Sequence, residues 1–394
     1  MTKKNTINSE KFDELVVAHR RNLHQYAEVG FDLPKTREYI TQNLSRIGYE
    51  PKTIGNGSII ATIRGDKDEY ILLRADMDAL PIPEETNLPF KCINGCMHAC
   101  GHDMHTAMLL TAAEVLQNTS HKKGIIFLFQ AAEENLQGAN NVIESGALDA
   151  YKISFAIAVH VLVGLDYAPG KLVIPPHGLV APGACVFNFE LIGKSSHGST
   201  PHKGVNSIYP AIDIIQAINR MLMVEFAPND LKFINWGYLH GGLEANIIPE
   251  KTVLKGNFRY YDAAVKEKAI KRIKEIAENI SKSNNTECEF YINGWCPPLC
   301  NNAFILHKIE TIININGFDY ITPDAIQADK KSSDIGGSED FAHFAQKYPS
   351  ALISICAGNS STGHTHTIHT SKTNFHEDAL KSGWRFFVAI SENL

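Results

Sequence analysis

The feature that most constrains the fold of this chain is a series of short apolar runs, each followed by helical or turn-rich sequence. The runs span Ser58–Ile63, Tyr70–Arg74, Gly124–Gln130 and Ile153–His160. Apolar runs of this length that carry few charges are typical of buried strands in a largely parallel sheet with helices on its faces. The sequence therefore predicts an α/β fold in which helices cover a mixed sheet.

The middle of the chain has a different pattern, which predicts a second, smaller domain. Its elements follow the order strand, helix, strand, strand, helix, strand, which is typical of an α+β domain of ferredoxin-like type. The expected helices are Asn206–Glu225 and Ala263–Ser283, and the expected strands are 186–193, Leu231–Leu239, Thr252–Arg259 and Glu287–Tyr291. We therefore expect a catalytic domain of residues 1–184 and 296–394, interrupted by an inserted lid of residues 185–295.

Composition excludes several classes of protein. The formal net charge of −6 argues against a nucleic-acid binder, which would carry a basic surplus. No apolar run reaches the length of a membrane span, so we expect no membrane partner. The start MTKKNTINSEKFDEL has no apolar core after its lysines and is therefore not a secretory signal. Eight cysteines without such a signal are expected to be reduced, which predicts a cytoplasmic protein.

Acidic residues and a histidine stand at the ends of three of the apolar runs. Asp76 and Asp78 follow the second run, and residues two apart in an extended chain face the same side. Glu133 and Glu134 follow the third run, where neighbours diverge, so one carboxylate can bind metal while the other faces a reacting water. His160 ends the fourth run. Because ligands gather beyond the carboxyl ends of strands in open α/β sheets, these residues predict one shared site.

A segment rich in histidine lies between these strand ends. Cys100 and His102 precede the helical run TAMLLTAAEVL, and they can converge if they lie on the turn that enters the helix, which Gly101 makes easy. A thiolate and an imidazole suit Zn²⁺ and tolerate Mn²⁺, Co²⁺ or Ni²⁺. The segment GHTHTIHTS supplies three more histidines, His364, His366 and His369. Each motif alone is more often structural than functional, but together they predict a metal-dependent active site.

These motifs resemble the M20 family of metallopeptidases and amidohydrolases, above all its hippurate hydrolases, N-acyl-amino-acid amidohydrolases and plant auxin-conjugate hydrolases. The resemblance covers nearly the whole chain. It is carried by LHQYAEVGF, LLRADMDALPIPEE, MHACGHDMHTAML, FQAAEEN-QGA, AVHV, GKSSHGSTPHKGVNSI, GGLEANIIPE, GNFRYYD, GSEDFA and HTSKTNFHEDAL. It implies a phosphorylase/hydrolase-like catalytic domain and an inserted ferredoxin-like lid that forms a homodimer or homotetramer.

The resemblance also implies two divalent metal ions per subunit, with Zn²⁺, Mn²⁺, Ni²⁺ and Co²⁺ as the candidates. The implied ligands are Cys100, His102, Glu134, His160 and His369. Glu133 matches the general base, and Asp78 matches the acidic residue that orients a ligand. His197 matches a lid histidine that reaches the partner subunit's active site and polarises the scissile carbonyl. Asn246 and Arg259 match lid residues that bind the substrate's carboxylate.

The activity that the resemblance implies is hydrolysis of the amide bond of an N-acyl amino acid by a metal-activated water. One alternative keeps the chemistry and changes the bond, which gives a dipeptidase or a carboxypeptidase. Another is a metal-binding regulatory protein without catalysis, although Glu133 and every implied ligand are present. A zinc nucleobase deaminase is a weaker alternative, because its His-x-Glu and Pro-Cys-x-x-Cys pairing is absent.

Overall fold

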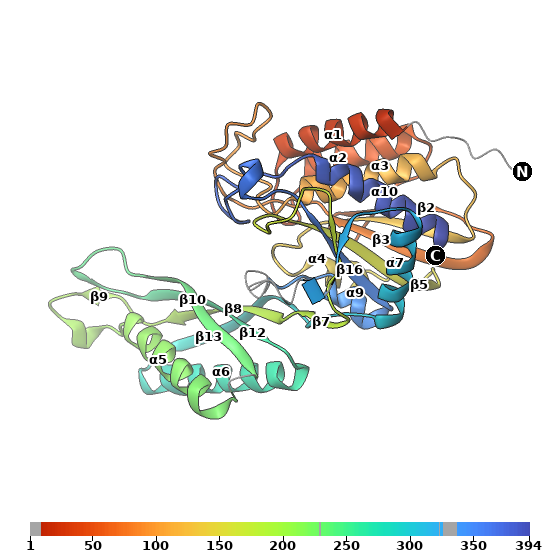
Figure 1. Cartoon of the computed structure of the whole chain (residues 1–394). Coiled ribbons are helices and arrows are strands. Elements are labelled where there is room, and N and C mark those ends of the chain that lie inside the picture. The colour runs from red at the N-terminus through yellow and green to blue at the C-terminus, as the bar shows by residue number, and fades with distance from the viewer. Residues whose placement is uncertain (1–8, 228–229, 323, 326–336) are drawn as a thin grey trace, which may run out of the picture. The chain divides into compact units, whose positions relative to one another are not determined.

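The computed structural model describes residues 9–227, 230–322, 324–325 and 337–394 (Figure 1). In it the chain forms two compact units. The main unit comprises the described parts of Met1–Val180, Leu299–Gly336 and Asp340–Leu394, and the inserted unit comprises Ala181–Pro298 and Gly337–Glu339.

The described residues of the main unit form an eight-stranded mixed sheet with the order β1-β2-β4-β3-β5-β16-β6-β15. Its centre is parallel, from β4 through β3 and β5 to β16, while β2 and β6 join antiparallel on either side. The strands are β1 (Lys52–Ile54), β2 (Ser58–Ile63), β3 (Lys67–Asp76), β4 (Lys123–Gln130), β5 (Ile153–Leu162), β6 (Leu172–Val173), β15 (Tyr320–Ile321) and β16 (Ser350–Cys356). The predicted mixed sheet is confirmed, and the four apolar runs lie in β2, β3, β4 and β5.

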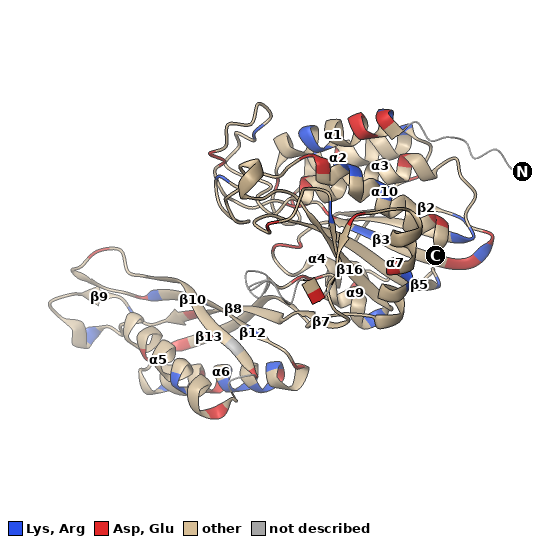
Figure 2. Ribbon diagram, viewed as in Figure 1, with Lys and Arg blue, Asp and Glu red and all other residues tan. Residues whose placement is uncertain are grey.

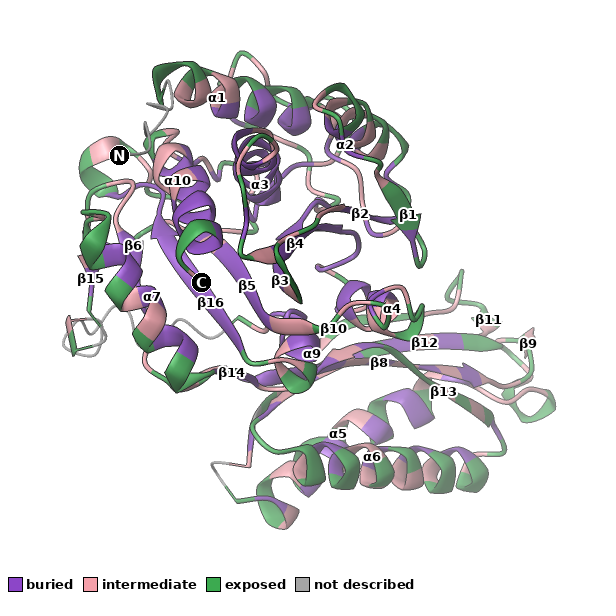
Figure 3. Cartoon of the chain, turned by 90° about the vertical axis from the view of Figure 1, so that its right-hand side faces the viewer, coloured by how far each residue is buried: buried purple, intermediate pink, exposed green. Residues whose placement is uncertain are grey.

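The helices of the main unit cover this sheet (Figures 1 and 3). They are α1 (Ser9–Tyr26), α2 (Pro34–Arg46), α3 (His102–Leu116), α4 (Gly138–Glu144), α7 (Ala303–Ile315), α9 (Ala342–Lys347) and α10 (Asp378–Asn393). Helix α3 packs against β3 and β5 on one side and against α1 and α10 on the other. All of its residues except Glu114 are buried, which explains why its sequence is apolar around the whole helix.

The inserted unit has the predicted order of elements. They are β8 (Gly183–Ile192), α5 (Ile208–Glu225), β10 (Leu231–Gly241), β12 (Lys251–Tyr260), α6 (Ala263–Ser283) and β13 (Glu287–Cys296). Its described residues form an antiparallel four-stranded sheet in the order β10-β12-β8-β13, and α5 and α6 pack on one face of it (Figure 3). Phe187, Phe189, Leu254 and Phe258 form the centre of this core. The ferredoxin-like expectation is confirmed.

Two strands in the inserted unit are too short to be predicted from the sequence. Strand β9 (Ser196–His197) pairs antiparallel with β11 (Ile247–Ile248), and His197 is the partner of Ile247. A strand of two residues has no periodicity, so the pairing becomes visible only in three dimensions. It brings together two segments that carry predicted site residues.

Residues of both charges lie along α6 (Figure 2). Lys271 and Lys274 lie one helical turn before Glu275 and Glu278, and the pairs are 4.0 and 3.8 Å apart. Such exposed pairs contribute little to stability but keep a helix face solvated. Among the described residues, no helix is long and apolar enough to cross a membrane.

Candidate metal centre

Asp78 organises the edge of the sheet where the predicted carboxylates lie. It follows β3, and its side chain is fully buried. Its Oδ1 accepts a hydrogen bond from the N–H of Glu133 at 3.0 Å, and its Oδ2 accepts one from the N–H of Glu134 at 3.2 Å. Asp78 therefore holds the turn after β4 that carries both glutamates.

His102 is the first residue of α3, and the turn before it requires glycine. Gly101 has φ of 89°, and a Cβ there would lie 2.4 Å from Cγ2 of Val161. His102 Nδ1 lies 2.9 Å from the carbonyl oxygen of Asp78, so Nδ1 is the donor of this hydrogen bond. Burial opposes the charged ring, but the nearby Asp76 carboxylate raises the pKa of His102 well above its usual value, so Nε2 must lose a proton before it can bind metal. Nε2 is buried without a hydrogen-bond partner among the described residues, and it lies 3.9 Å from Glu133 Oε2.

Cys100 and His160 meet beside His102. The Sγ atom of Cys100 is 3.5 Å from Nε2 of His160, and the Nδ1 atom of His160 donates to the carbonyl of Val161 at 2.8 Å. Burial lowers the pKa of His160 to about 3, so its ring is neutral at physiological pH. Burial also raises the pKa of the Cys100 thiol well above its usual value. A neutral imidazole can bind metal directly, whereas this thiol must first lose its proton.

Glu134 and His369 meet on the other side of the cluster, with Oε2 and Nε2 3.5 Å apart. Burial raises the pKa of Glu134 to about 7. The N–H of His369 donates to the carbonyl of Ala99 at 3.0 Å, which ties the histidine-rich C-terminal segment to the turn before α3. His369 and Ala132 have φ of 63° and 56°. Non-glycine residues in this region store about 1–3 kcal/mol each, so backbone strain is concentrated around the predicted ligands.

The predicted ligand atoms form overlapping groups in which all atoms lie within 4.8 Å of one another. One group is Cys100, His102 and His160, and another is Cys100, Glu134 and His369. The two groups share Cys100, so five side chains form one continuous set of thiol, imidazole and carboxylate donors. Buried Nε2 of His102 and Oε1 of Glu134 have no hydrogen-bond partner among the described residues. Such a donor set fits divalent transition-metal ions.

Asp76, at the end of β3, is held by other protein groups. Arg74 Nη1 donates to its Oδ2 at 2.7 Å, and His105 Nδ1 lies 2.6 Å from its Oδ1. Nε2 of His105 accepts the N–H of Val161 at 2.9 Å, which supports the strand that carries His160. Sequence reasoning missed Arg74 and His105. The available signal was the position of His105 three residues after His102, on the same helix face.

The lid residues of the prediction lie in the inserted unit. His197 and Asn246 are both exposed, and they are neighbours across the β9–β11 pairing, where the N–H of Gly198 donates to the carbonyl of Asn246 at 2.7 Å. Arg259 lies on β12, is half-buried, and donates to Oδ1 of Asn257 at 3.4 Å. Burial lowers the pKa of Arg259. The structure thus brings His197 and Asn246 together within this unit.

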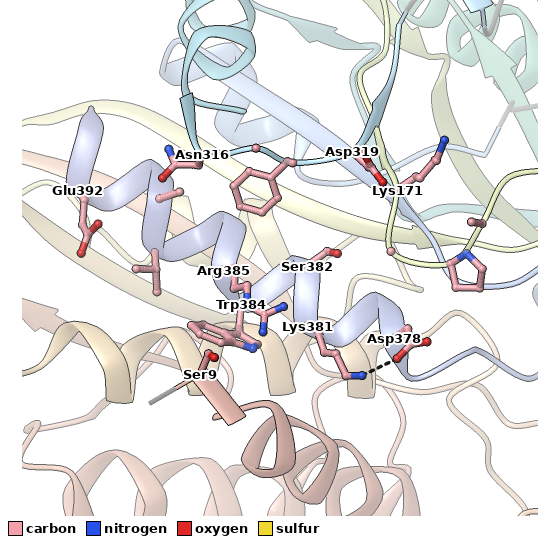
Figure 4. A pocket seen from close by; sticks show the side chains of 17 residues that line it. Ser9, Lys171, Asn316, Asp319, Asp378, Lys381, Ser382, Trp384, Arg385 and Glu392 are labelled. Carbon is pink, nitrogen blue, oxygen red and sulfur yellow. Dashed lines mark hydrogen bonds and ion pairs between the residues drawn. The ribbon is translucent and has the colours of Figure 1, made fainter. Parts of the chain in front are cut away.

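A pocket of about 670 Å³ in the main unit contains none of the predicted site residues (Figure 4). It is lined mainly by α10 and by segments that adjoin β6 and α7. Lys381 pairs with Asp378 at 2.7 Å inside it, and Arg385 pairs with Asp13 at 2.6 Å. Two of its cations are therefore neutralised by neighbouring carboxylates, and the pocket lacks the donor set of the metal centre.

The fold and the donor cluster define a metal-dependent hydrolase that acts on amide or peptide bonds. The chain belongs to the peptidase family M20/M25/M40, whose model matches residues 72–393.

Individual relatives are similar over most of their length. N-acetyl-L-cysteine deacetylase from Bacillus subtilis is 33% identical over 88% of this chain and 82% of its own length. Thermostable carboxypeptidase 1 from Saccharolobus solfataricus is 30% identical over 95% of this chain and 93% of its own length. The crystal structure of a dinuclear metal-binding peptidase of the M20 family from Bacillus subtilis matches with a TM-score of 0.71 and 25% identity, covering 98% of this chain and 100% of that one.

Proposed function

We propose that this protein hydrolyses the amide bond of N-acyl amino acids at a centre of two divalent metal ions. The proposal rests above all on the five donors around Cys100, with Oε2 of Glu133 only 3.9 Å from the metal-facing Nε2 of His102. Metal ions bound in this cluster would polarise the amide as Lewis acids and would lower the pKa of a water. Glu133 takes a proton from that water and passes it to the leaving amine.

The main unit divides the remaining tasks among fixed side chains. Cys100, His102, Glu134, His160 and His369 hold the metals. Asp78 orients three of the side chains at this site. Its carboxylate accepts hydrogen bonds from the N–H groups of Glu133 and Glu134, and its carbonyl oxygen accepts one from Nδ1 of His102. Each of these contacts exists before substrate binds, which keeps reorganisation small during the reaction.

In the inserted unit, we propose that His197 polarises the scissile carbonyl and that Asn246 and Arg259 bind the substrate's carboxylate. A guanidinium can hold a carboxylate by two parallel hydrogen bonds, and Arg259 makes a long hydrogen bond of 3.4 Å to Oδ1 of Asn257. The half-buried position of Arg259 would strengthen such a pairing. These roles make the free carboxylate of the substrate the group that the protein selects.

We propose further that the inserted unit forms a dimer with a second copy of this chain, so that His197 serves the partner's site. Strand β10 is an edge of the four-stranded sheet, and it exposes Tyr238 and Leu239. On α5, Tyr209 and Ile212 are also exposed. An edge strand exposes unpaired backbone N–H and C=O groups beside these apolar side chains. Pairing of two identical edges about a twofold axis would bury both. A cytoplasmic location is proposed because all eight cysteines are free thiols.

A carboxypeptidase activity is the second candidate, because a thermostable carboxypeptidase is 30% identical over nearly the whole chain. Both activities need the same metal centre and the same grip on a free carboxylate. They differ in the group on the other side of the scissile bond, which is an acyl group in one case and a peptide in the other.

The test is a substrate panel with the metal-loaded protein. N-acetyl amino acids, hippurate, dipeptides and longer peptides are incubated separately with protein reconstituted with Zn²⁺, Mn²⁺, Co²⁺ or Ni²⁺. The proposal predicts the highest kcat/KM for N-acyl amino acids, and a sharp loss when the carboxylate is amidated. Faster cleavage of peptides than of every N-acyl amino acid would establish the carboxypeptidase alternative.

A further inference from the structure

A fully buried ion network lies behind the proposed metal centre. Arg74 is 1% exposed and sits between two carboxylates that are themselves 0% exposed. Its Nη1 donates to Oδ2 of Asp76 at 2.7 Å, and its Nη2 donates to Oδ1 of Asp340 at 2.9 Å. Burying such charges costs free energy unless each is paired and hydrogen-bonded. Even a fully paired network often adds little stability over apolar side chains, so stability alone is a weak explanation for this network.

The carboxylate of Asp340 receives donors from three separate elements. Besides Arg74 of β3, the Nε2 atom of Gln130 at the end of β4 lies 2.8 and 2.9 Å from its two oxygens. The N–H of Ala139, in the first turn of α4, donates to its Oδ2 at 2.9 Å. Gln130 is in turn fixed, because its Oε1 accepts from Nε of Arg74 at 2.9 Å. Asp340 is therefore held in one position and one orientation.

The main-chain N–H of Asp340 contacts the carboxylate of Glu133, the proposed general base. The N–H of Asp340 donates to Oε1 of Glu133 at 3.3 Å, while Oε2 of the same carboxylate faces His102. The main chain of Glu133 is fixed independently, because its own N–H donates to Oδ1 of Asp78 at 3.0 Å. Two aspartates thus hold Glu133, one at its main chain and one at its side chain.

We infer that Asp340 is a positioning residue that anchors one oxygen of Glu133 and thereby presents the other to the attacking water. This inference rests on the proposed function, in which Glu133 acts on that water. A glutamate side chain turns about three bonds, and an anchored oxygen removes most of that freedom. Reaction rates depend on such placement, since a displacement of about 1 Å can cost on the order of 10²-fold. Asp340 lies in the GSEDFA motif, to which the proposed function assigns no other role.

The test compares Asp340→Asn with a matched substitution elsewhere. Asp340→Asn keeps the shape of the side chain but weakens its hold on Arg74, so the main chain of residue 340 can shift. We expect kcat to fall about 10²-fold, KM to stay within about threefold, and zinc loading measured by chelator competition to be unchanged. The control is Asp13→Asn, which removes the charge of a half-buried aspartate that accepts hydrogen bonds from Trp384 and Arg385 between α1 and α10. It should lower stability without changing kcat.

A second variant covers the case in which Asp340→Asn does not fold. Gln130→Met introduces no charge, keeps the length of the side chain, and deletes the donor to both oxygens of Asp340. It should lower kcat in the same direction by about tenfold, again without loss of zinc. A wild-type kcat in whichever variant folds would overturn the inference.

A crystal structure of the metal-loaded variant separates this inference from the proposed function. The inference predicts that Oε1 of Glu133 leaves the N–H of residue 340 or that the side chain occupies two conformers. An unchanged Glu133 would refute it even if no substrate were ever cleaved. Conversely, a wild-type protein that cleaves no substrate in the panel would refute the proposed function. The position of Glu133 in the variant would still show whether Asp340 anchors its side chain.

Discussion

The two units of this molecule treat their functional side chains in opposite ways. In the main unit Asp78 and His102 are 0% exposed, Cys100 and Glu133 are buried, Glu134 and His160 are half-buried, and His369 is the exposed member of the set. In the inserted unit His197 and Asn246 are exposed on a short two-stranded pairing. The role of each candidate residue in the main unit can therefore be inferred from its contacts within that unit. Under the proposed function, the exposed residues of the inserted unit act only when a substrate or a second subunit is present.

Two helices show the same contrast. In α3 every residue but Glu114 is buried, and the helix begins with a proposed metal ligand. In α6 only five residues are buried, Lys266, Ala269, Ile273, Ala277 and Ser281, and charged pairs occupy the outer face. A helix that is surrounded on all sides can hold a ligand rigidly, whereas an amphipathic surface helix mainly covers a sheet. Substitutions of the proposed ligands in the main unit should therefore lower metal binding, whereas substitutions of the predicted site residues in the inserted unit should lower catalysis without metal loss.

The largest effect that would sharpen this contrast is expected for His197→Ala. If the imidazole is a preorganised donor to the scissile carbonyl, its loss should lower kcat by about 10²–10³-fold while the metal content stays at the wild-type level. Kinetics and metal analysis on the same sample measure both quantities. Loss of metal would break the comparison, because it would place His197 among the ligands.

The shared-site model adds a complementation test. Inactive His197→Ala and inactive Glu133→Gln subunits are mixed and allowed to exchange, and each heterodimer then contains one site with an intact Glu133 and an intact His197. Part of the activity should return. No recovery, with exchange verified by mass spectrometry, would confine His197 to its own chain.

A smaller effect, of the opposite kind, is expected for Cys100→Ser. Both three-residue groups of the cluster contain Cys100, so metal affinity should fall by about 10²-fold or more, beyond the 10–100-fold typical of lost outer partners. Thiol reagents should also modify Cys100 faster in apoprotein than in metal-loaded protein. Cys92 and Cys96 lie nearby in sequence and are replaced first as a control. Equal labelling rates in both forms would exclude a metal-bound thiolate.

The smallest predicted effect concerns pH. Burial raises the pKa of Glu134 to about 7 and that of Cys100 well above its usual value, so both groups must lose protons when metal binds. Metal affinity should therefore rise with pH by about tenfold per unit for each proton released, and more steeply below pH 7, where Glu134 also contributes. Chelator competition measures this slope. The Glu134→Gln variant should lose the additional steepness, and an equal slope in both proteins would contradict the assignment.

Much of the fold could be predicted because its elements are long and periodic. The runs that became β2, β4 and β5 are mostly apolar and contain no Lys, Arg, Asp or Glu, and α6 matches its predicted bounds of Ala263–Ser283. Strands β9 and β11 could not be predicted, since two residues carry no periodicity and their pairing joins segments about fifty residues apart.

The candidate site shows the same limit. Asp78, Glu133 and Glu134 stand at strand ends, which sequence patterns indicate directly. Arg74 and Asp340 are 266 residues apart in sequence, and only the fold brings them to 2.9 Å. The sequence around Arg74 shows a single arginine in an apolar strand and does not indicate which carboxylate pairs with it.

The central claim is that Glu133 acts on water while Glu134 acts on metal. Its most direct test measures turnover of an N-acyl amino acid and bound metal together, in Glu133→Gln and Glu134→Gln. The account predicts that Glu133→Gln lowers kcat by about 10²–10⁴-fold with metal content unchanged, and that Glu134→Gln loses metal. A Glu133→Gln protein that loses its metal, beside a Glu134→Gln protein that keeps both metal and turnover, would contradict it.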